Sequence, residues 1–166
     1  MDRKNYVEYL SRTFEKNFSI EKNKKVMGQE LLCFGKWSME YGRTLLTKDK
    51  VVDKYICNEY CLIDSMEVLT EEKLSNFINY LKQGTIDLVK ANKEHKSTYI
   101  TGILVVDTIQ HNNIKKLINK FSYSKNYKFS FHGWCEVRLV VVEIGDKQIY
   151  NNKACRDLVK NLYFNK

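Results

Sequence analysis

The sequence predicts an α+β fold, in which a single mixed, largely antiparallel β-sheet of about five or six strands is flanked by helices. Apolar residues recur at three- and four-residue steps near both ends of the chain and twice in between, as they do in amphipathic helices. The segments between these stripes are rich in β-branched and aromatic residues, which favour strands. No linker, repeat or low-complexity tract divides the 166 residues, so we expect a single domain over residues 1–166.

The first third of the chain predicts one helix followed by strands. Residues 3–18 carry one apolar stripe of a helix, and the basic segment 22–25 ends that period. Residues 31–46 predict two strands, or one strand with a bulge or bend, because two glycines interrupt an aromatic and apolar run. Residues 54–64 are apolar on both parities, which indicates a central strand buried on both faces.

The middle of the chain predicts a helix, a strand and a second, shorter helix. Thr70 is a suitable N-cap for a helix that continues to about residue 89, although Gly84 is able to interrupt or kink it. Residues 97–107 form a β-branched run bounded by polar loops, which is typical of a strand. Residues 114–121 then carry the stripe of a short amphipathic helix.

The last third predicts a hairpin and a terminal helix. From residue 127 the period becomes two, and Gly145-Asp146 supplies the turn to a return strand that ends near Tyr150. Residues 155–162 carry a final helical stripe. The residues of the first hairpin strand that we expect to face the core are Phe129, Phe131, Cys135, Val137, Leu139 and Val141.

Composition limits the classes of protein to consider. Lysine and arginine exceed aspartate and glutamate by eight, which favours polyanionic partners such as nucleic acid. An AT-rich genome also enriches lysine and asparagine and removes proline, so this charge alone does not establish binding. No apolar run approaches the ~18 residues of a membrane span, and the N-terminus lacks a signal-peptide pattern, so we expect no membrane partner. Five cysteines, an odd count, indicate reduced thiols and a cytoplasmic location.

The most prominent polar pattern is a row along the predicted hairpin strand, made of His132, Trp134, Glu136 and Arg138. Alternate residues of a strand project from one face at steps of about 6.6 Å. Such a row is able to bind an anion through Arg138, with Glu136 orienting the guanidinium and Trp134 offering a stacking surface. The alternative is a structural face, on which Glu136 and Arg138 pair with each other and Trp134 packs against a helix.

Nucleophilic and metal sites find little support in the sequence. Cys135 and His132 have opposite parity in one strand, so the imidazole cannot activate the thiol. Cys57 and Cys61 would lie about 13 Å apart in an extended strand, too far to bind one zinc ion. No phosphate-binding loop, dinucleotide fingerprint, nucleophile elbow or zinc-protease motif occurs. We therefore expect buried structural cysteines, no metal and no cofactor.

A second candidate surface is basic and aromatic. The aromatic segment 121–131 is accompanied by Lys115, Lys116, Lys120, Lys125 and Lys128, which are candidates for binding a polyanion. Aromatic rings beside cations stack single-stranded bases and neutralise phosphates. The alternative is that Tyr127, Phe129 and Phe131 are buried, because they share the parity of the predicted core face.

Asp53 and the stretch Glu59-Tyr60-Cys61 carry a resemblance to restriction-endonuclease-like nucleases. The expected order of a helix, a strand meander, a helix and a strand is similar to the core of that family. The family's motif holds magnesium through an aspartate, often after proline, and an acid-x-lysine on the next strand. Here cysteine stands in place of that lysine and no proline precedes Asp53. The resemblance therefore implies a divalent-ion site without the lysine that supports the attacking water.

Three segments carry a second resemblance: "KEHKSTYITGILVVD", "FHGWCEVRLVVVE" and "YNNK". They look like segments of a family of small cytosolic bacterial proteins, mostly from clostridia and their relatives, described only as a domain of unknown function. The resemblance spans the chain from about Phe34 onward. It implies a single cytosolic domain and no particular activity.

We expect a binding domain without catalytic activity, with nucleic acid or another polyanion as the first partner to test. The first alternative is an enzyme, such as a divergent metal-dependent nuclease or another hydrolase, with a site assembled across elements. Its residues would be a subset of His111, His132, Glu40, Glu59, Glu136 and Arg138. The second alternative is a homodimeric interaction module joined through an exposed strand edge or the aromatic segment 125–131.

Overall fold

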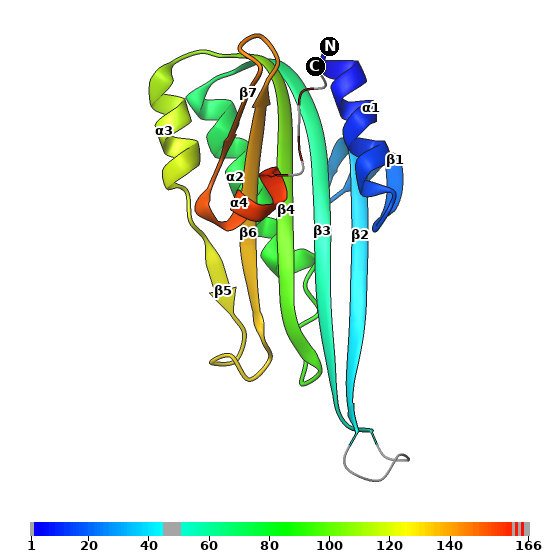
Figure 1. Cartoon of the computed structure of the whole chain (residues 1–166). Coiled ribbons are helices and arrows are strands. Elements are labelled where there is room, and N and C mark those ends of the chain that lie inside the picture. The colour runs from blue at the N-terminus through cyan, green and yellow to red at the C-terminus, as the bar shows by residue number, and fades with distance from the viewer. Residues whose placement is uncertain (1, 45–50, 161, 163, 165–166) are drawn as a thin grey trace.

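The computed structural model describes residues 2–44, 51–160, 162 and 164, which form a long twisted sheet with helices on both faces (Figure 1). The elements follow in the order α1 (Arg3–Phe14), β1 (Ser19–Val26), β2 (Gln29–Thr44), β3 (Val51–Leu69), α2 (Glu71–Asp87), β4 (His95–Ile109), α3 (Asn112–Lys120), β5 (Ser124–Asn126), β6 (Trp134–Glu143), β7 (Gln148–Asn151), the 3-10 turn η1 (Lys153–Cys155) and α4 (Arg156–Val159).

The seven strands form one mixed sheet in the order β1-β2-β3-β4-β6-β5, with β7 also paired to β6. β1, β2 and β3 form an antiparallel meander, and β3, β4 and β6 run parallel to one another. β5 and β7 pair antiparallel with the two ends of β6. The α+β fold class is confirmed, and the described residues form seven strands in place of the five or six expected.

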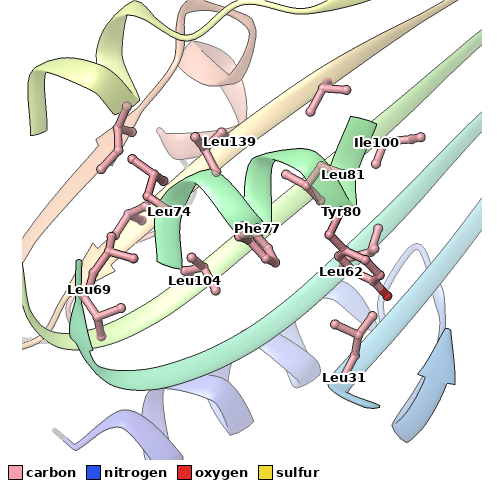
Figure 2. Close-up of a cluster of buried hydrophobic side chains, with 14 of the residues drawn as sticks. Leu31, Leu62, Leu69, Leu74, Phe77, Tyr80, Leu81, Ile100, Leu104 and Leu139 are labelled. Atoms are coloured by element: carbon pink, nitrogen blue, oxygen red, sulfur yellow. The ribbon is translucent and has the colours of Figure 1, made fainter. Parts of the chain in front are cut away.

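The far face of the sheet in Figure 1 is covered by α2 and α3. Figure 2 shows Leu74, Phe77 and Leu81 of α2 packed over the strands, next to Leu104 of β4. Gly102 allows this close approach, because a Cβ at that position would lie 2.4 Å from Cδ1 of Leu81. Burying aliphatic side chains of this size stabilises the fold by about 1.5–3 kcal/mol each, so α2 fixes the position of β4.

The near face is covered only in part. Tyr6 and Leu10 of α1 pack with Cys61 and Ile103 of the sheet, and Cys155 of η1 joins the same cluster. In Figure 1, α1 and α4 lie in front of the upper part of this face. The lower part, where β4 and β6 begin, has no helix in front of it among the described elements. Among the described elements, no helix therefore covers the lower part of this sheet face.

Most predicted elements are confirmed with small changes in their bounds. The Thr70 side chain accepts a hydrogen bond from the backbone N–H of Lys73 and caps α2, which continues through Gly84 without interruption. The predicted central strand corresponds to β3, which lies between β2 and β4. The terminal stripe is shorter than expected, since it forms η1 and an α4 that ends at Val159.

The predicted alternative of one strand with a bulge is confirmed for residues 31–44, because β2 runs as one strand to Thr44 and its register with β3 shifts between Arg43 and Thr44. Residues 45 and 46 lie outside the described residues. Gly35 does not break β2. A Cβ there would lie 2.8 Å from Cδ1 of Ile20, so the glycine lets the first and second strands pack closely.

Two strands were missing from the prediction. β1 pairs with β2 through the turn Met27-Gly28, whose φ angles of 47° and 85° suit a tight hairpin. β5 pairs with the start of β6 over three residues. Both strands lie at sheet edges and are mostly polar, so neither carries the apolar pattern that indicates a strand.

The prediction that Phe129 and Phe131 face the core is wrong. β6 begins only at Trp134, and both phenylalanines are exposed in the preceding turn. Three successive residues, Lys128 to Ser130, have φ angles of 45°, 53° and 71°, which turn the chain out of the strand. The remaining residues of the predicted core face, Cys135, Val137, Leu139 and Val141, are buried as expected.

None of the helices in the described part of the chain is long and apolar enough to span a membrane.

Candidate functional site

The polar row predicted along β6 is present for three of its four members. Trp134, Glu136 and Arg138 are half-buried and project from the near face of the sheet. His132 lies in the turn before the strand. Its carbonyl oxygen accepts a hydrogen bond of 2.6 Å from Nδ1 of His95. This contact holds the turn in place, and His132 does not extend the row.

The neighbouring strands place further side chains beside this row. Glu136 is in register with Tyr99 of β4, Tyr99 with Glu59 of β3, and Glu59 with Trp37 of β2. One step along the strands, Arg138 is in register with Thr101. Residues in register share one face of a sheet, at about 4.8 Å between adjacent strands. We call this set the open-face site, and it consists of Trp37, Glu59, Tyr99, Thr101, Trp134, Glu136 and Arg138.

Arg138 and Glu59 form the centre of the open-face site. Nη1 of Arg138 donates a 3.0 Å hydrogen bond to Oε1 of Glu59, and Oγ1 of Thr101 donates to the same oxygen at 3.0 Å. The two side chains are 19% and 15% exposed, so solvent reaches them only from the open side. The expected pairing of Arg138 with Glu136 is replaced by pairing with Glu59, two strands away.

Aromatic rings line the open side of this ion pair. The guanidinium carbon of Arg138 lies 3.4 Å from the centre of the Tyr99 ring, in a stacked cation–π arrangement. The rings of Tyr99 and Trp134 pack edge to face, with ring centres 5.3 Å apart at 81°. Nε of Arg138 is buried and has no hydrogen-bond partner among the described residues. The site therefore combines fixed aromatic surfaces with a guanidinium that Glu59 and Tyr99 hold in place.

The cysteines do not contribute a nucleophile to this site. Burial raises the pKa of the Cys61 thiol well above its ordinary value. Burial likewise raises the pKa of Cys135 and of Cys155 to about 12 each. A thiol with a raised pKa is protonated at neutral pH and reacts slowly, so the interpretation of these residues as structural is supported.

The described residues do not bring together a set of metal ligands. In the described part of the chain, no three histidine, cysteine or acidic side chains are close enough to hold an ion. Asp53 and Glu59, the nearest match to the nuclease motif, lie in the same strand, six positions apart. Six steps along a strand separate the two backbone positions by about 20 Å, which does not match a compact pair of ion ligands. The side chain of Asp53 lies outside the described residues.

Of the residues named for an enzyme site, Glu59, Glu136 and Arg138 are brought together. Glu40 is in register with Ile56 and lies on the opposite face, where its carboxylate is 2.9 Å from Nζ of Lys54. His111 is exposed at the start of α3, beyond the other end of β4. These two residues belong to different surfaces from the open-face site.

The predicted lysine surface is divided: Lys115, Lys116 and Lys120 lie on α3, which packs on the opposite face of the sheet from the open-face site, whereas Lys125 lies on β5 and Lys128 in the turn before β6. Lys115 is held 2.9 Å from a carboxylate oxygen of Glu143 and 3.3 Å from one of Asp146. Nζ of Lys125 lies 5.6 Å from the ring centre of Tyr127. The other three lysines of this set, Lys116, Lys120 and Lys128, are exposed.

A family described as a domain of unknown function, DUF8052, matches residues 2–164. The chain belongs to this family. The match confirms the expected resemblance to a domain of unknown function and extends it from Phe34 back to residue 2. No curated protein and no solved structure matches the chain.

The DUF8052 domain has a concave surface where β4 begins, which we call the end cleft. It encloses about 570 Å³. Trp134 lines both the end cleft and the open-face site, so the two surfaces are continuous. The other residues that line the cleft are Tyr41, Gly42, Tyr55, Lys93, His95, Lys96, Ser130, Phe131 and Gly133.

Sequence reasoning missed Trp37, Tyr99 and the end cleft of the DUF8052 domain. The sequence indicates which face of its own strand each residue occupies, but it does not indicate how neighbouring strands align. The sequence around Trp37 carried one signal. A tryptophan flanked by Lys36 and Ser38 in a predicted strand indicates a partly polar surface rather than a purely apolar core.

Proposed function

We propose that this DUF8052 domain binds single-stranded nucleic acid across the open-face site and acts without catalysis. The observation that carries the proposal is the set of aromatic side chains Trp37, Tyr99 and Trp134 beside Arg138 on a helix-free part of the sheet. Sheet faces of this composition bind unpaired bases by stacking, whereas bases in a duplex are not accessible to such rings.

The rigidity of the aromatic rings supports this function. Tyr99, whose face is covered by the Arg138 guanidinium, packs against the Trp134 ring and holds it in place. A ring already fixed in its bound orientation loses little conformational entropy when a base stacks on it. The pairing of Arg138 with Glu59 fixes the guanidinium plane on this face of the sheet.

The overall charge supports the same class of ligand. The chain carries a formal net charge of +8, which attracts a polyanion before any specific contact forms. Binding through phosphate neutralisation releases counterions, so the logarithm of the affinity falls linearly with the logarithm of the salt concentration.

The proposal is tested by fluorescence anisotropy with a labelled single-stranded oligonucleotide of mixed sequence and the matching duplex. We expect binding to the single strand at low salt, weaker binding to the duplex, and a steep loss of affinity as salt is added. No binding at low salt, or an affinity that does not change with salt, would contradict the proposal.

Variants then place the binding surface. Trp37→Ala is expected to lower the affinity for the single strand about tenfold, because one stacked base contributes roughly 1–3 kcal/mol. Leu117→Ala, at an exposed apolar position on α3, is the matched control and should leave the affinity unchanged. The double variant Lys116→Ala and Lys120→Ala tests the lysine surface. If it weakens binding more than Trp37→Ala does, the polyanion binds at α3 and the open-face site is excluded.

A hydrolase is the second candidate function, favoured by the carboxylates of Glu59 and Glu136 on either side of Tyr99. To decide between the two functions, the oligonucleotide is incubated with the protein and magnesium, and its length is measured afterwards. Cleavage that is lost in Glu59→Gln would favour the enzyme, and an intact strand favours binding. A homodimer joined through segment 125–131 stays a prediction, and light scattering measures it directly.

A further inference from the structure

The turn between β5 and β6 holds an unusual backbone conformation. Lys128, Phe129 and Ser130 are successive residues with positive φ angles of 45°, 53° and 71°. Residues other than glycine rarely adopt this region, because it costs them conformational free energy. Strain of this kind persists only where the surrounding structure holds it, and such places concentrate at binding sites.

Several contacts hold this turn in its conformation. The backbone N–H of Phe131 donates to the carbonyl of Lys128 at 3.0 Å, and Nδ1 of His95 donates to the carbonyl of His132 at 2.6 Å. Gly133 lies directly against the start of β4, since a Cβ there would be 2.4 Å from the carbonyl oxygen of Lys96. The turn is therefore fixed to β4.

The turn fixes two phenylalanines in solvent with different surroundings. Phe129 is 97% exposed and Phe131 is 81% exposed, although both are among the most apolar side chains. Phe131 lines the end cleft, whereas Phe129 does not. A strained turn that keeps Phe131 exposed beside a cleft is suited to a partner that covers the ring.

The opposite wall of the end cleft is also aromatic and basic. Tyr41 and Tyr55 are cross-strand partners in β2 and β3, whose hairpin extends beyond the start of β4 (Figure 1). Nζ of Lys96 lies 5.5 Å from the ring centre of Tyr55, and Lys93 lines the cleft beside it. Among the described residues that line the cleft, two are lysines and none carries a carboxylate.

We propose that the end cleft binds a nucleotide, with the base between Phe131 and Tyr41 and the phosphate beside Lys93 and Lys96. The cleft volume of about 570 Å³ lies within the range of small-ligand sites. The nucleotide comes either free or as an unpaired residue of the strand on the open-face site, and only the second source rests on the proposed function.

The test is a calorimetric titration of the whole chain with adenosine 5′-monophosphate, adenosine and inorganic phosphate. We expect the monophosphate to bind more tightly than either part alone, because rings and lysines act on different groups. Phe131→Ala should weaken binding of the monophosphate about tenfold, while Phe129→Ala, in the same turn but outside the cleft, leaves it unchanged. The double variant Lys93→Ala and Lys96→Ala should remove the difference between the monophosphate and adenosine.

The source of the nucleotide is decided with a labelled single-stranded oligonucleotide. If the free monophosphate does not bind, but Phe131→Ala weakens oligonucleotide binding and Phe129→Ala does not, the cleft takes a residue of a strand. The inference is overturned if neither ligand depends on Phe131, if the two phenylalanine variants behave alike, or if inorganic phosphate alone binds as tightly as the monophosphate.

Trp37 separates this inference from the proposed function, because it belongs to the open-face site and does not line the cleft. Oligonucleotide binding that is lost in Trp37→Ala but complete in Phe131→Ala upholds the open-face site and overturns the end cleft. If the chain binds no oligonucleotide but binds the monophosphate in a way that requires Phe131, the end cleft is upheld and the open-face site is overturned.

Discussion

At the scale of single residues, Lys115 is a structural cation rather than a free one. Its Nζ lies 2.9 Å from Oε2 of Glu143, a carboxylate that is buried and also accepts a 2.6 Å hydrogen bond from the backbone N–H of Ile109. Hydrogen bonding raises the pKa of Lys115, with Tyr150 as the largest cause and Glu143 as the next. This lysine thus compensates a charge that the fold has removed from water.

Lys115→Ala should lower the free energy of unfolding by about 2–3 kcal/mol, because it leaves the Glu143 carboxylate buried without its cation. Lys116→Ala, the adjacent exposed lysine, is the control and should change stability by less than about 0.5 kcal/mol. Urea unfolding of both variants measures the difference. Equal stability of the two variants would show that Lys115 does not compensate Glu143.

The pH dependence of this difference follows from the raised pKa of Lys115. A lysine with a raised folded-state pKa contributes stability that is fully present below its unfolded pKa of about 10.4. The contribution is lost as the pH rises through the folded value. The gap between wild type and Lys115→Ala should therefore be constant near neutral pH and narrow only in alkaline buffer.

At the scale of elements, one side chain completes the edge of β6. β5 pairs with β6 up to Glu136, and β7 pairs with it from Val140 onward, which leaves the Leu139 N–H and the Val137 carbonyl on this edge without a strand partner. The Asn152 side chain fills this gap, since its Oδ1 accepts from the N–H of Leu139 and its Nδ2 donates to the carbonyl of Val137, both at 3.0 Å. A buried amide here replaces a strand residue.

Asn152→Ala should destabilise the fold by about 2 kcal/mol, because it leaves a buried donor and a buried acceptor on β6 without partners. Asn151→Ala removes only one hydrogen bond, to the carbonyl of Asn152, and is expected to cost less. Thermal unfolding of the two variants provides the comparison. The idea fails if the Asn151 variant is the less stable of the two.

The elements that could be predicted were those whose own residues carry an apolar period. The stripes of α1, α2 and α3 and the runs of β3 and β4 depend on local geometry alone. β1 and β5 could not be predicted, because an edge strand is recognised by its partner more than by its own polar residues. Phe129 and Phe131 continued the period of β6, and only the left-handed turn interrupts it.

At the scale of the whole molecule, β4 is the centre of the fold. It lies between the parallel strands β3 and β6, with α2 on one face and α1 on the other. Residues from Ile103 to Val106 are completely buried. The edges β1 and β5, in contrast, each pair with a single strand.

Hydrogen exchange should follow this arrangement. We expect the amides of residues 103–106 to exchange most slowly, near the rate set by global unfolding, and those of β1 and β5 to exchange fastest among the strands. Mass spectrometry of peptides after exchange measures this order. Rapid exchange in β4 would show that the sheet does not open as one cooperative unit.

The sequence by itself determined the fold class, the positions of the main helices and the common face of Trp134, Glu136 and Arg138, because these depend on periods within one segment. Only the tertiary structure decided that Glu59, Tyr99 and Trp37 lie beside Arg138, since register between strands distant in sequence is set by packing across the whole sheet. It also decided that Phe131 faces a cleft while Phe129 faces solvent, because contacts from His95 and Gly133 hold the turn against the start of β4.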